Sequence, residues 1–333
     1  MATPIPELIG SPLPAISVIL PVLNEESHLE GAVLSVLSQD YRGPLEIILA
    51  LGPSRDRTNE IATKLASHDN RVKLIDSPTG KTAAGLNIAL AASKSPVVVR
   101  VDGHAQIPKN YISLIVEILN KTGAVNVGGV MAAVGTTAFE RAVAGAMRSP
   151  LGVGASRFHT GGEAGEVDTV YLGAFRREAL VAIGGFDERF TRAQDWELNF
   201  RLRENGGVIY FDPRLHVTYR PRSSVSALAK QYFEYGRWRR VVSRRHSGTI
   251  NYRYLAPPFA LLGFSASLIL GIALSSIFFI PALVYLLFVV LASLKISTSI
   301  GEYLLLLLVI PTMHFAWGAG FISSPKTLVP ASQ

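Results

Sequence analysis

Three long runs without a charged side chain lie near the C-terminal end of the chain, and they constrain its fold more than any other feature. The runs are Leu255–Leu274, Ser276–Leu294 and Tyr303–Ser324. Each is close to the roughly 20 residues that an α-helix needs to cross a bilayer. One such run could be a buried core helix, but three in succession predict about three transmembrane helices over residues 254–324. The first two runs adjoin, which predicts a tight helical hairpin.

The positive charge of the chain is concentrated just before these runs. Residues 220–253 hold nine Lys and Arg side chains and one acidic side chain, whereas residues 1–219 hold 21 basic and 23 acidic side chains. A basic block beside apolar runs follows the positive-inside rule and is suited to anionic lipid. This pattern predicts a multi-pass protein of the cell membrane with a basic interfacial segment at 220–253. We expect the N-terminal domain to be cytoplasmic and nucleic acid not to be a partner.

Composition excludes several classes of protein. The chain contains no cysteine, which excludes disulfide scaffolds, thiolate metal sites and cysteine nucleophiles. A mean hydropathy of +0.31, with 49% hydrophobic residues, excludes a disordered chain. Residues 1–14 are rich in proline and lack the basic-then-apolar pattern of a signal peptide, so we expect an N-terminal tail there. A C-terminal tail is expected at 325–333.

Residues 15–219 alternate between strand and helix patterns. Apolar strand runs occupy 16–20, 45–50, 72–75 and 96–101, and helical spacing occupies 26–39, 58–66 and 81–92. This alternation predicts an α/β domain with a mostly parallel, Rossmann-like sheet that helices cover on both faces. Ligands bind such sheets at the carboxyl ends of the strands. The segments 21–25, 52–56 and 102–104 are therefore candidate parts of a binding site.

The order of motifs resembles that of the family 2 glycosyltransferases of the GT-A fold. The matching segments are ISVILPVLNEE at 16–26, the turn at 51–56, VDGHA at 101–105 and DERFTRAQDWELNFRLRENGG at 187–207. Segments 167–176 and 231–238 are most similar to membrane-anchored exopolysaccharide enzymes of the succinoglycan type. The resemblance covers most of residues 15–245. It implies a GT-A domain at 15–219 that transfers a sugar from a nucleotide-sugar donor.

The resemblance implies a divalent cation at Asp102 and His104, which occupy the position of the family's Asp-x-Asp motif. Such a cation stabilises the charge that develops on the diphosphate leaving group, and carboxylate ligands suit Mg²⁺ or Mn²⁺. The imidazole in place of the second carboxylate favours Mn²⁺, because imidazole is the softer ligand. The alternative is that Asp102 caps the helix after Pro108 and that His104 is a surface residue.

Asp195 lies where the family places its general base, at the start of a predicted helix that runs to Glu204. An inverting transfer requires a carboxylate to accept the proton of the acceptor hydroxyl. Glu197 is the competing candidate, although it precedes Arg201 by four residues and is therefore placed for an ion pair on the same helix. Trp196 would partly exclude water beside Asp195.

The remaining site residues also come from the resemblance. The implied donor-binding residues are Pro21, Asn24, Glu25, Ser54, Asp56, Lys81 and Asp102. The implied acceptor-binding residues are Gly173, Ala174, Phe175, Trp196, Arg237 and Trp238. The family's second motif usually begins with two acidic residues that are Leu51 and Gly52 here, and a UDP-sugar is the favoured donor. For Lys81 a solvated surface lysine is the alternative, and for the loop at 173–175 an ordinary turn.

These features together predict an inverting, metal-dependent enzyme that moves one sugar to a membrane-held acceptor, such as a polyprenyl-diphosphate-linked glycan, in cell-surface polysaccharide synthesis. Processive synthases carry Gln-x-x-Arg-Trp, whereas Gln231 is followed at position 234 by Glu, which favours a single transfer. A simple polyprenyl phosphate is the alternative acceptor. A non-catalytic membrane scaffold is the alternative from another class.

Overall fold

The structure is a computed structural model that describes residues 13–250 and 252–329, and these residues form two compact units. The first unit contains residues 13–132 and 161–218, and the second contains the rest. Segment 133–160 therefore packs with the C-terminal helices, although it lies inside the predicted domain 15–219. Most of the predicted N-terminal tail and the last four residues of the predicted C-terminal tail lie outside the described residues.

The first unit is built on a mixed eight-stranded sheet with the strand order β3-β2-β1-β4-β7-β5-β8-β6. The four predicted strands are confirmed as the parallel part of this sheet: β1 (Ile16–Val22), β2 (Leu45–Leu51), β3 (Val72–Asp76) and β4 (Val97–Arg100). Their apolar runs are suited to a sheet covered on both faces. The other strands are β5 (Asn126–Ala133), β6 (Gly165–Glu166), β7 (Tyr171–Arg176) and β8 (Ile209–Tyr219). Strand β7 is antiparallel to both β4 and β5.

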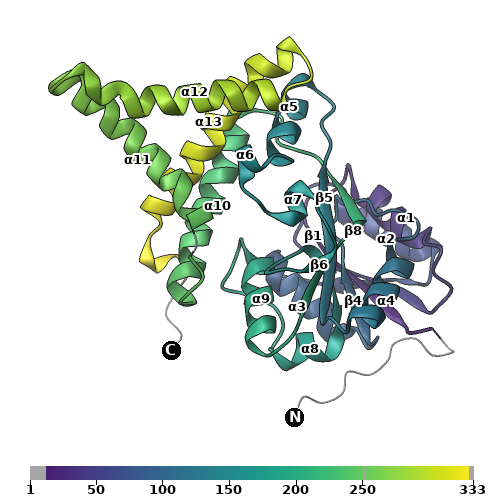
Figure 1. Ribbon diagram of the computed structural model, residues 1–333. Helices are drawn as coiled ribbons and strands as arrows, with labels where there is room; N and C mark the ends of the chain where they lie inside the picture. The colour runs from purple at the N-terminus through teal and green to yellow at the C-terminus, as the bar shows by residue number, and fades with distance from the viewer. Residues whose placement is uncertain (1–12, 251, 330–333) are drawn as a thin grey trace. The chain divides into compact units, whose positions relative to one another are not determined.

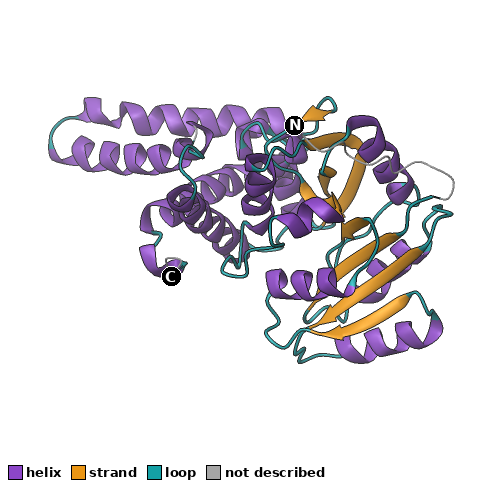
Figure 2. Cartoon of the chain, turned by 90° about the horizontal axis from the view of Figure 1, so that it is seen from below, coloured by secondary structure: helices purple, strands orange, loops and turns teal. Residues whose placement is uncertain are grey.

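Helices cover both faces of this sheet, as Figures 1 and 2 show. One face carries α1 (Leu29–Leu37), α2 (Thr58–His68) and α4 (Tyr111–Thr122). The other face carries α3 (Thr82–Ala92), α8 (Arg177–Ala182) and α9 (Gln194–Glu204). Helix α1 begins three residues later than predicted, because residues 26–28 form a turn in which the N–H groups of His28 and Leu29 both donate to the Glu25 carbonyl.

The second unit is helical. It contains α5 (Ala138–Met147), α6 (Pro150–Val153), α7 (Arg157–Thr160), α10 (Val225–Arg245), α11 (Tyr252–Ala273), η1 (Ser276–Phe279), α12 (Ile280–Ile296), α13 (Ile300–Ser323) and η2 (Lys326–Leu328). Three of these segments, α11, η1–α12 and α13, are long and apolar enough to cross a membrane, with hydropathies of 1.9, 2.7 and 1.8. They coincide with the three uncharged runs of the sequence.

Candidate active site

The loops that follow β1 and β2 are tied together by hydrogen bonds between backbone and side chains. The Asn24 N–H donates to the Ser54 hydroxyl at 3.1 Å, and the Asn24 side-chain oxygen accepts from the Arg55 N–H at 2.8 Å. One residue further along, the Glu25 N–H donates to the Thr58 hydroxyl at 2.7 Å. The structure thus brings together the donor residues predicted in the first two motifs.

Asp56 completes this pair of loops. Its carboxylate accepts hydrogen bonds from the Thr58 hydroxyl, the Thr58 N–H and the Glu26 N–H, at 2.5, 3.1 and 3.3 Å. The hydrogen bond from Thr58 is the main reason that the pKa of Asp56 lies below its ordinary value. The predicted donor residue Asp56 therefore holds the loop as a carboxylate.

Two other predicted donor residues lie beside these loops. Pro21 is in β1, opposite Ala50 of β2. Lys81 is exposed and directly precedes α3. A Cβ on Gly52 would lie 3.1 Å from the Cα of Gly80, so the two backbones meet at glycines and bring Lys81 next to the second loop.

Arg100, at the end of β4, joins the predicted metal ligand to the predicted base. Its Nε lies 3.0 Å from Asp102 Oδ1, its Nη2 lies 3.3 Å from Asp102 Oδ2, and its Nη1 contacts Asp195 Oδ1. The Arg100 side chain is only 7% exposed. Burial alone would lower its pKa, but the charges of Asp102 and Asp195 outweigh burial and raise it. Asp102 and Asp195, far apart in the chain, thus share one guanidinium.

Arg100 was not among the residues expected from the sequence. The signal that could have revealed it is a single arginine inside the apolar strand run 96–101. A buried charge is costly unless it is paired, so an arginine in such a strand requires acidic partners nearby.

Asp195 lies in the first turn of α9, as predicted. Burial raises the pKa of its carboxyl above the ordinary value, and this effect and the charge of Asp102 outweigh the opposing influence of Arg100. A raised pKa makes a carboxylate a better proton acceptor. Trp196 is half-buried beside it and stacks on Phe200, with ring centroids 5.8 Å apart.

Glu197 has a structural environment. Its side chain is 2% exposed, and its two oxygens lie 2.7 and 2.8 Å from Nε and Nη2 of Arg201. Arg201 also donates to the carbonyl oxygens of Ile183 and Gly185. Glu197 therefore joins α9 to the turn after α8, which is the ion-pair role that its spacing from Arg201 predicted.

Backbone strain marks three of the predicted motifs. Among the described residues, the non-glycine residues with positive φ are Asn24, Leu172 and Ala193, at 55°, 60° and 59°. Asn24 is in the first motif, Leu172 precedes the predicted acceptor loop, and Ala193 directly precedes the helix that carries Asp195. Strain of this kind persists where the surrounding structure enforces it, and it is frequent at functional sites.

His104 and Asp102 have different neighbours. His104 Nδ1 lies 2.8 Å from Glu25 Oε1, and no group of three His, Asp or Glu side chains forms a cation cage within the part of the chain that the structure describes. A Mg²⁺-type ion in a phosphate-transfer site commonly takes one or two protein ligands and the remainder from phosphates and water. A carboxylate behind one ring nitrogen is also the usual support of a metal-binding histidine. The residues present therefore fit a cation that is shared with a diphosphate.

The predicted acceptor loop is only partly suited to contact a sugar. Gly173 has a φ of 91°, and a Cβ there would lie 2.8 Å from Asn126 Oδ1. Ala174 and Phe175 are each 1% exposed, and Phe175 packs edge-on against Phe186 in the core. Phe175, which was expected to bind the acceptor, is therefore a core residue, because its side chain points to the face of the sheet that α3 and α9 cover.

The last two predicted acceptor residues belong to the second unit. Arg237 and Trp238 lie in α10, where Arg237 Nη1 is 2.7 Å from Glu234 Oε1 and Trp238 is 5% exposed. The acid that distinguishes this segment from Gln-x-x-Arg-Trp thus pairs with the arginine of the same segment.

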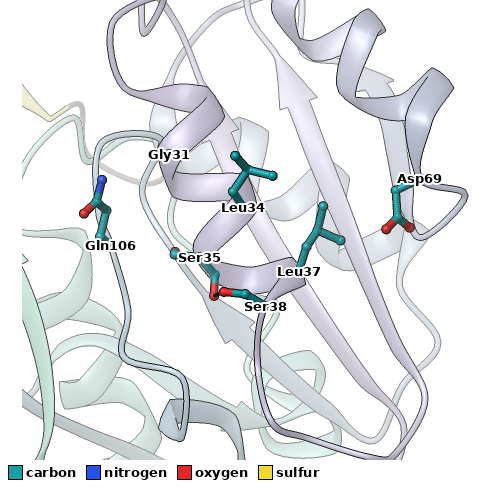
Figure 3. A pocket seen from close by; sticks show the side chains of 7 residues that line it. All are labelled: Gly31, Leu34, Ser35, Leu37, Ser38, Asp69 and Gln106. Atoms are coloured by element: carbon teal, nitrogen blue, oxygen red, sulfur yellow. Dashed lines mark hydrogen bonds between the residues drawn. The ribbon is translucent and has the colours of Figure 1, made fainter.

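A surface depression over α1 is separate from these residues (Figure 3). It is lined by Gly31, Leu34, Ser35, Leu37, Ser38, Asp69 and Gln106. The lining has one carboxylate and lies along a helix rather than at the carboxyl ends of strands, so it offers little for nucleotide chemistry.

Comparison with known proteins identifies the family of this chain. The model of the glycosyl transferase family 2 matches residues 17–184. The chain belongs to glycosyltransferase family 2. It is 34% identical to the succinoglycan biosynthesis protein ExoA of Rhizobium meliloti, over 72% of this chain and 73% of that protein. It is therefore an enzyme of that family, and the scaffold alternative is not supported.

Two more distant proteins extend the comparison. A dolichyl N-acetyl-α-D-glucosaminyl phosphate 3-β-D-2,3-diacetamido-2,3-dideoxy-β-D-glucuronosyltransferase of Methanococcus voltae is 24% identical, over 73% of this chain and 77% of that protein. The mannosyltransferase PcManGT of Pyrobaculum calidifontis, solved with GDP-Man and Mn²⁺, superposes with a TM-score of 0.66 at 21% identity, over 93% of this chain and 87% of that one. The expected GT-A fold is confirmed.

Proposed function

We propose that this family 2 glycosyltransferase transfers a single sugar, with inversion, from a nucleotide-sugar donor to a membrane-held polyprenyl-diphosphate-linked glycan. The observation that carries the proposal is the shared contact of Asp102 and Asp195 with Arg100 at the carboxyl ends of the strands. This shared contact supports the proposal, because a candidate diphosphate-side carboxylate and a candidate base would then belong to one cluster. Both are needed where donor and acceptor meet.

Asp195 is the proposed general base. It accepts the proton of the acceptor hydroxyl while that oxygen attacks the anomeric carbon, opposite the departing nucleoside diphosphate. Arg100 positions the Asp195 carboxylate, and the raised pKa of Asp195 favours proton transfer. Trp196 limits the access of water to this side of the site.

The donor is proposed to bind at the joined loops after β1 and β2. Asn24, Glu25, Ser54 and Asp56 shape these loops, and Lys81 faces the diphosphate as a cation. Asp102 and His104 would hold Mn²⁺ or Mg²⁺, which when bound stabilises the negative charge of the leaving diphosphate. A UDP-sugar is our favoured donor, although the protein with the 0.66 TM-score was solved with GDP-Man.

The proposed acceptor rests on the kinds of relatives and on the apolar helices. One relative is named for succinoglycan biosynthesis, and another for transfer to a dolichyl-phosphate-linked sugar. A chain with apolar helices and a basic α10 is suited to a substrate that stays in the membrane. We further propose that the protein is a multi-pass protein of the cell membrane, with its GT-A domain on the cytoplasmic side.

The test is a panel of radiolabelled nucleotide sugars incubated with membranes that contain the enzyme and lipid-linked acceptors. We expect metal-dependent labelling of a lipid from which mild acid releases a glycan longer by one sugar. Asp195→Asn membranes are the matched control. A product in which the labelled sugar is bound directly to one lipid phosphate would replace the proposal with the polyprenyl-phosphate alternative.

A further inference from the structure

The three apolar segments of the second unit differ in what covers them, and this difference bears on how the chain enters the membrane. We infer that only the hairpin of α11, η1 and α12 enters the hydrocarbon, and that α13 lies along the membrane surface beside α10. The chain would then cross an even number of times, in place of the three crossings expected from composition. The inference rests on the proposed membrane location.

Helix α10 is too polar to cross a bilayer. It carries seven charged side chains: Lys230, Glu234, Arg237, Arg239, Arg240, Arg244 and Arg245. A charge at the centre of a bilayer costs about 2.5 to 3.5 kcal/mol even on the most lenient scale. A helix whose backbone packs directly against α10 must therefore share its position at the membrane surface where the two helices meet.

The C-terminal part of α13 packs against α10 in this way. At one end, the Ser324 carbonyl accepts from Arg244 Nη2 and the Ser324 hydroxyl donates to the Arg237 carbonyl, each at 2.9 Å. A few residues earlier in α13, and near the middle of α10, a Cβ on Gly236 would overlap the Trp317 carbonyl, and a Cβ on Gly320 would overlap the Phe233 carbonyl. The two backbones touch at glycines, so no lipid separates them.

The other end of α13 is also held by charged groups. Glu302 Oε1 lies 3.2 Å from Nε of Arg141 on α5, and the Arg141 side chain is 50% exposed. The start of α5 is joined to the segment before α10, because Glu140 Oε1 lies 3.2 Å from Arg220 Nε. The C-terminal end of α13 is therefore bonded to α10 itself. The N-terminal end is bonded to α5, which in turn is bonded to the segment just before α10, so both ends are held by the same polar region.

The hairpin has the opposite character. The side chains nearest its apex, Ile272, Leu274 and Ile277, are 82%, 69% and 63% exposed, and no charged residue lies between Leu255 and Leu294. The Ser267 hydroxyl donates to the Phe278 carbonyl and so joins its two arms. With 22 residues, α11 is about 33 Å long, enough for a hydrocarbon core of about 30 Å.

Figure 1 shows the same arrangement, with α11 and α12 meeting at an apex and α13 running back between their other ends. In the most apolar 18-residue stretch of each segment, 39% of the residues are buried in α13, compared with 17% in α11 and 22% in η1–α12. Lipid acyl chains are the surroundings that suit the exposed apolar hairpin. The anionic headgroups of the same lipids would then lie beside the arginines of α10 at the base of the hairpin.

The chain contains no cysteine, so single cysteines can be introduced into the full-length protein. Ser247→Cys marks the base before α11, Ser276→Cys the apex, and Thr327→Cys the end beyond α13; all three positions are exposed. Each variant is treated with a membrane-impermeant maleimide in sealed spheroplasts and in inverted vesicles. We expect the Ser247 and Thr327 variants to be labelled from the same face. We expect the Ser276 variant to resist labelling from that face until detergent is added.

Labelling of the Ser247 and Thr327 variants from opposite faces would restore the third crossing and overturn the inference. Labelling of the Ser276 variant from the Ser247 face without detergent would overturn the insertion of the hairpin. Release of the full-length protein by high salt alone would instead contradict the proposed membrane location, and this outcome is read independently of the labelling. Unmodified protein is the labelling control.

Discussion

At the scale of single residues, the contacts of Asp195 and Glu197 indicate different roles for these two carboxylates, which their positions in the sequence, only two residues apart, could not distinguish. Asp195 contacts Arg100 near the strand ends, whereas Glu197 is buried against Arg201. We expect Asp195→Asn to lower kcat by about 10² to 10⁴, the usual cost of removing a general base, with little change in donor affinity or thermal stability. Donor titration and single-turnover kinetics measure the two effects.

Glu197→Gln is the matched amide substitution two residues away. Breaking a fully buried ion pair costs about 3 to 5 kcal/mol. Because Arg201 is 23% exposed and keeps two carbonyl acceptors, we expect a smaller loss in unfolding free energy, on the order of 2 to 3 kcal/mol. The folded fraction should retain its rate. If Glu197→Gln were inactive while folded and Asp195→Asn were active, the base would be Glu197.

The pH dependence of the rate belongs to the same carboxyl. Because burial raises the pKa of Asp195, the base becomes protonated, and activity falls, at a higher pH than for an ordinary aspartate. We expect kcat/KM to decrease as the pH is lowered through this raised pKa, and the acid limb to be absent from the residual activity of Asp195→Asn. An unchanged limb in that variant would assign the titration to another group.

Glu25 is not a proposed metal ligand but contacts one, His104, so a substitution of Glu25 tests the proposed cation site indirectly. Its carboxylate lies 2.8 Å from His104 Nδ1, where it would orient the ring for metal binding. We expect Glu25→Gln to raise the Mn²⁺ concentration needed for half-maximal activity by about 10- to 100-fold. Glu26→Gln, the same change on the neighbouring residue, should leave that concentration unaltered. Equal Mn²⁺ requirements in both variants would remove Glu25 from metal binding.

At the scale of helices and strands, two glycines of α13 have different surroundings. A Cβ on Gly320 would overlap the Phe233 carbonyl, whereas a Cβ on Gly301 would meet nothing within 4 Å. We expect Gly320→Ala to destabilise the protein by about 1 to 3 kcal/mol, as overpacking does. Gly301→Ala should be neutral or slightly stabilising, because alanine favours a helix. Thermal unfolding in detergent distinguishes them, and equal melting temperatures would contradict the close contact of α10 and α13.

The elements that could be predicted from sequence are those set by local pattern. Apolar runs located β1, β2, β3 and β4, and the residues after them do lie at one set of strand ends. Arg100 could not be paired in advance, since its contact with Asp195 depends on how β4 and α9 meet across 95 positions. Phe175 was expected at the acceptor site but is buried in the core, because the motif does not indicate which face of β7 the helices cover. Segment 133–160 packs with the C-terminal helices although it lies inside the predicted domain 15–219, because the local pattern of a segment does not show which other part of the chain it packs against.

At the scale of the whole molecule, the second unit is not a simple addition to a soluble enzyme. Helix α13 covers α10 and contacts α5, both of which precede the hairpin in sequence. We therefore expect a chain that ends at Arg253 to expose the apolar face of α10 and to aggregate, whereas the full-length protein is monodisperse in detergent. Size-exclusion chromatography of the two provides the measurement, and a soluble, monodisperse truncated chain would contradict this dependence.

The left-handed backbone at Ala193 sets stability and activity against each other. An alanine at a φ of 59° costs about 1 to 2 kcal/mol that glycine would not. We expect Ala193→Gly to raise the melting temperature, because glycine relieves the backbone strain. We expect it also to lower kcat, because a more flexible backbone would position Asp195 less precisely. A melting temperature and kcat that rise together would contradict this. If the expected result holds, a laboratory selection for heat resistance alone would favour glycine at position 193 and would yield enzymes that are more stable but slower.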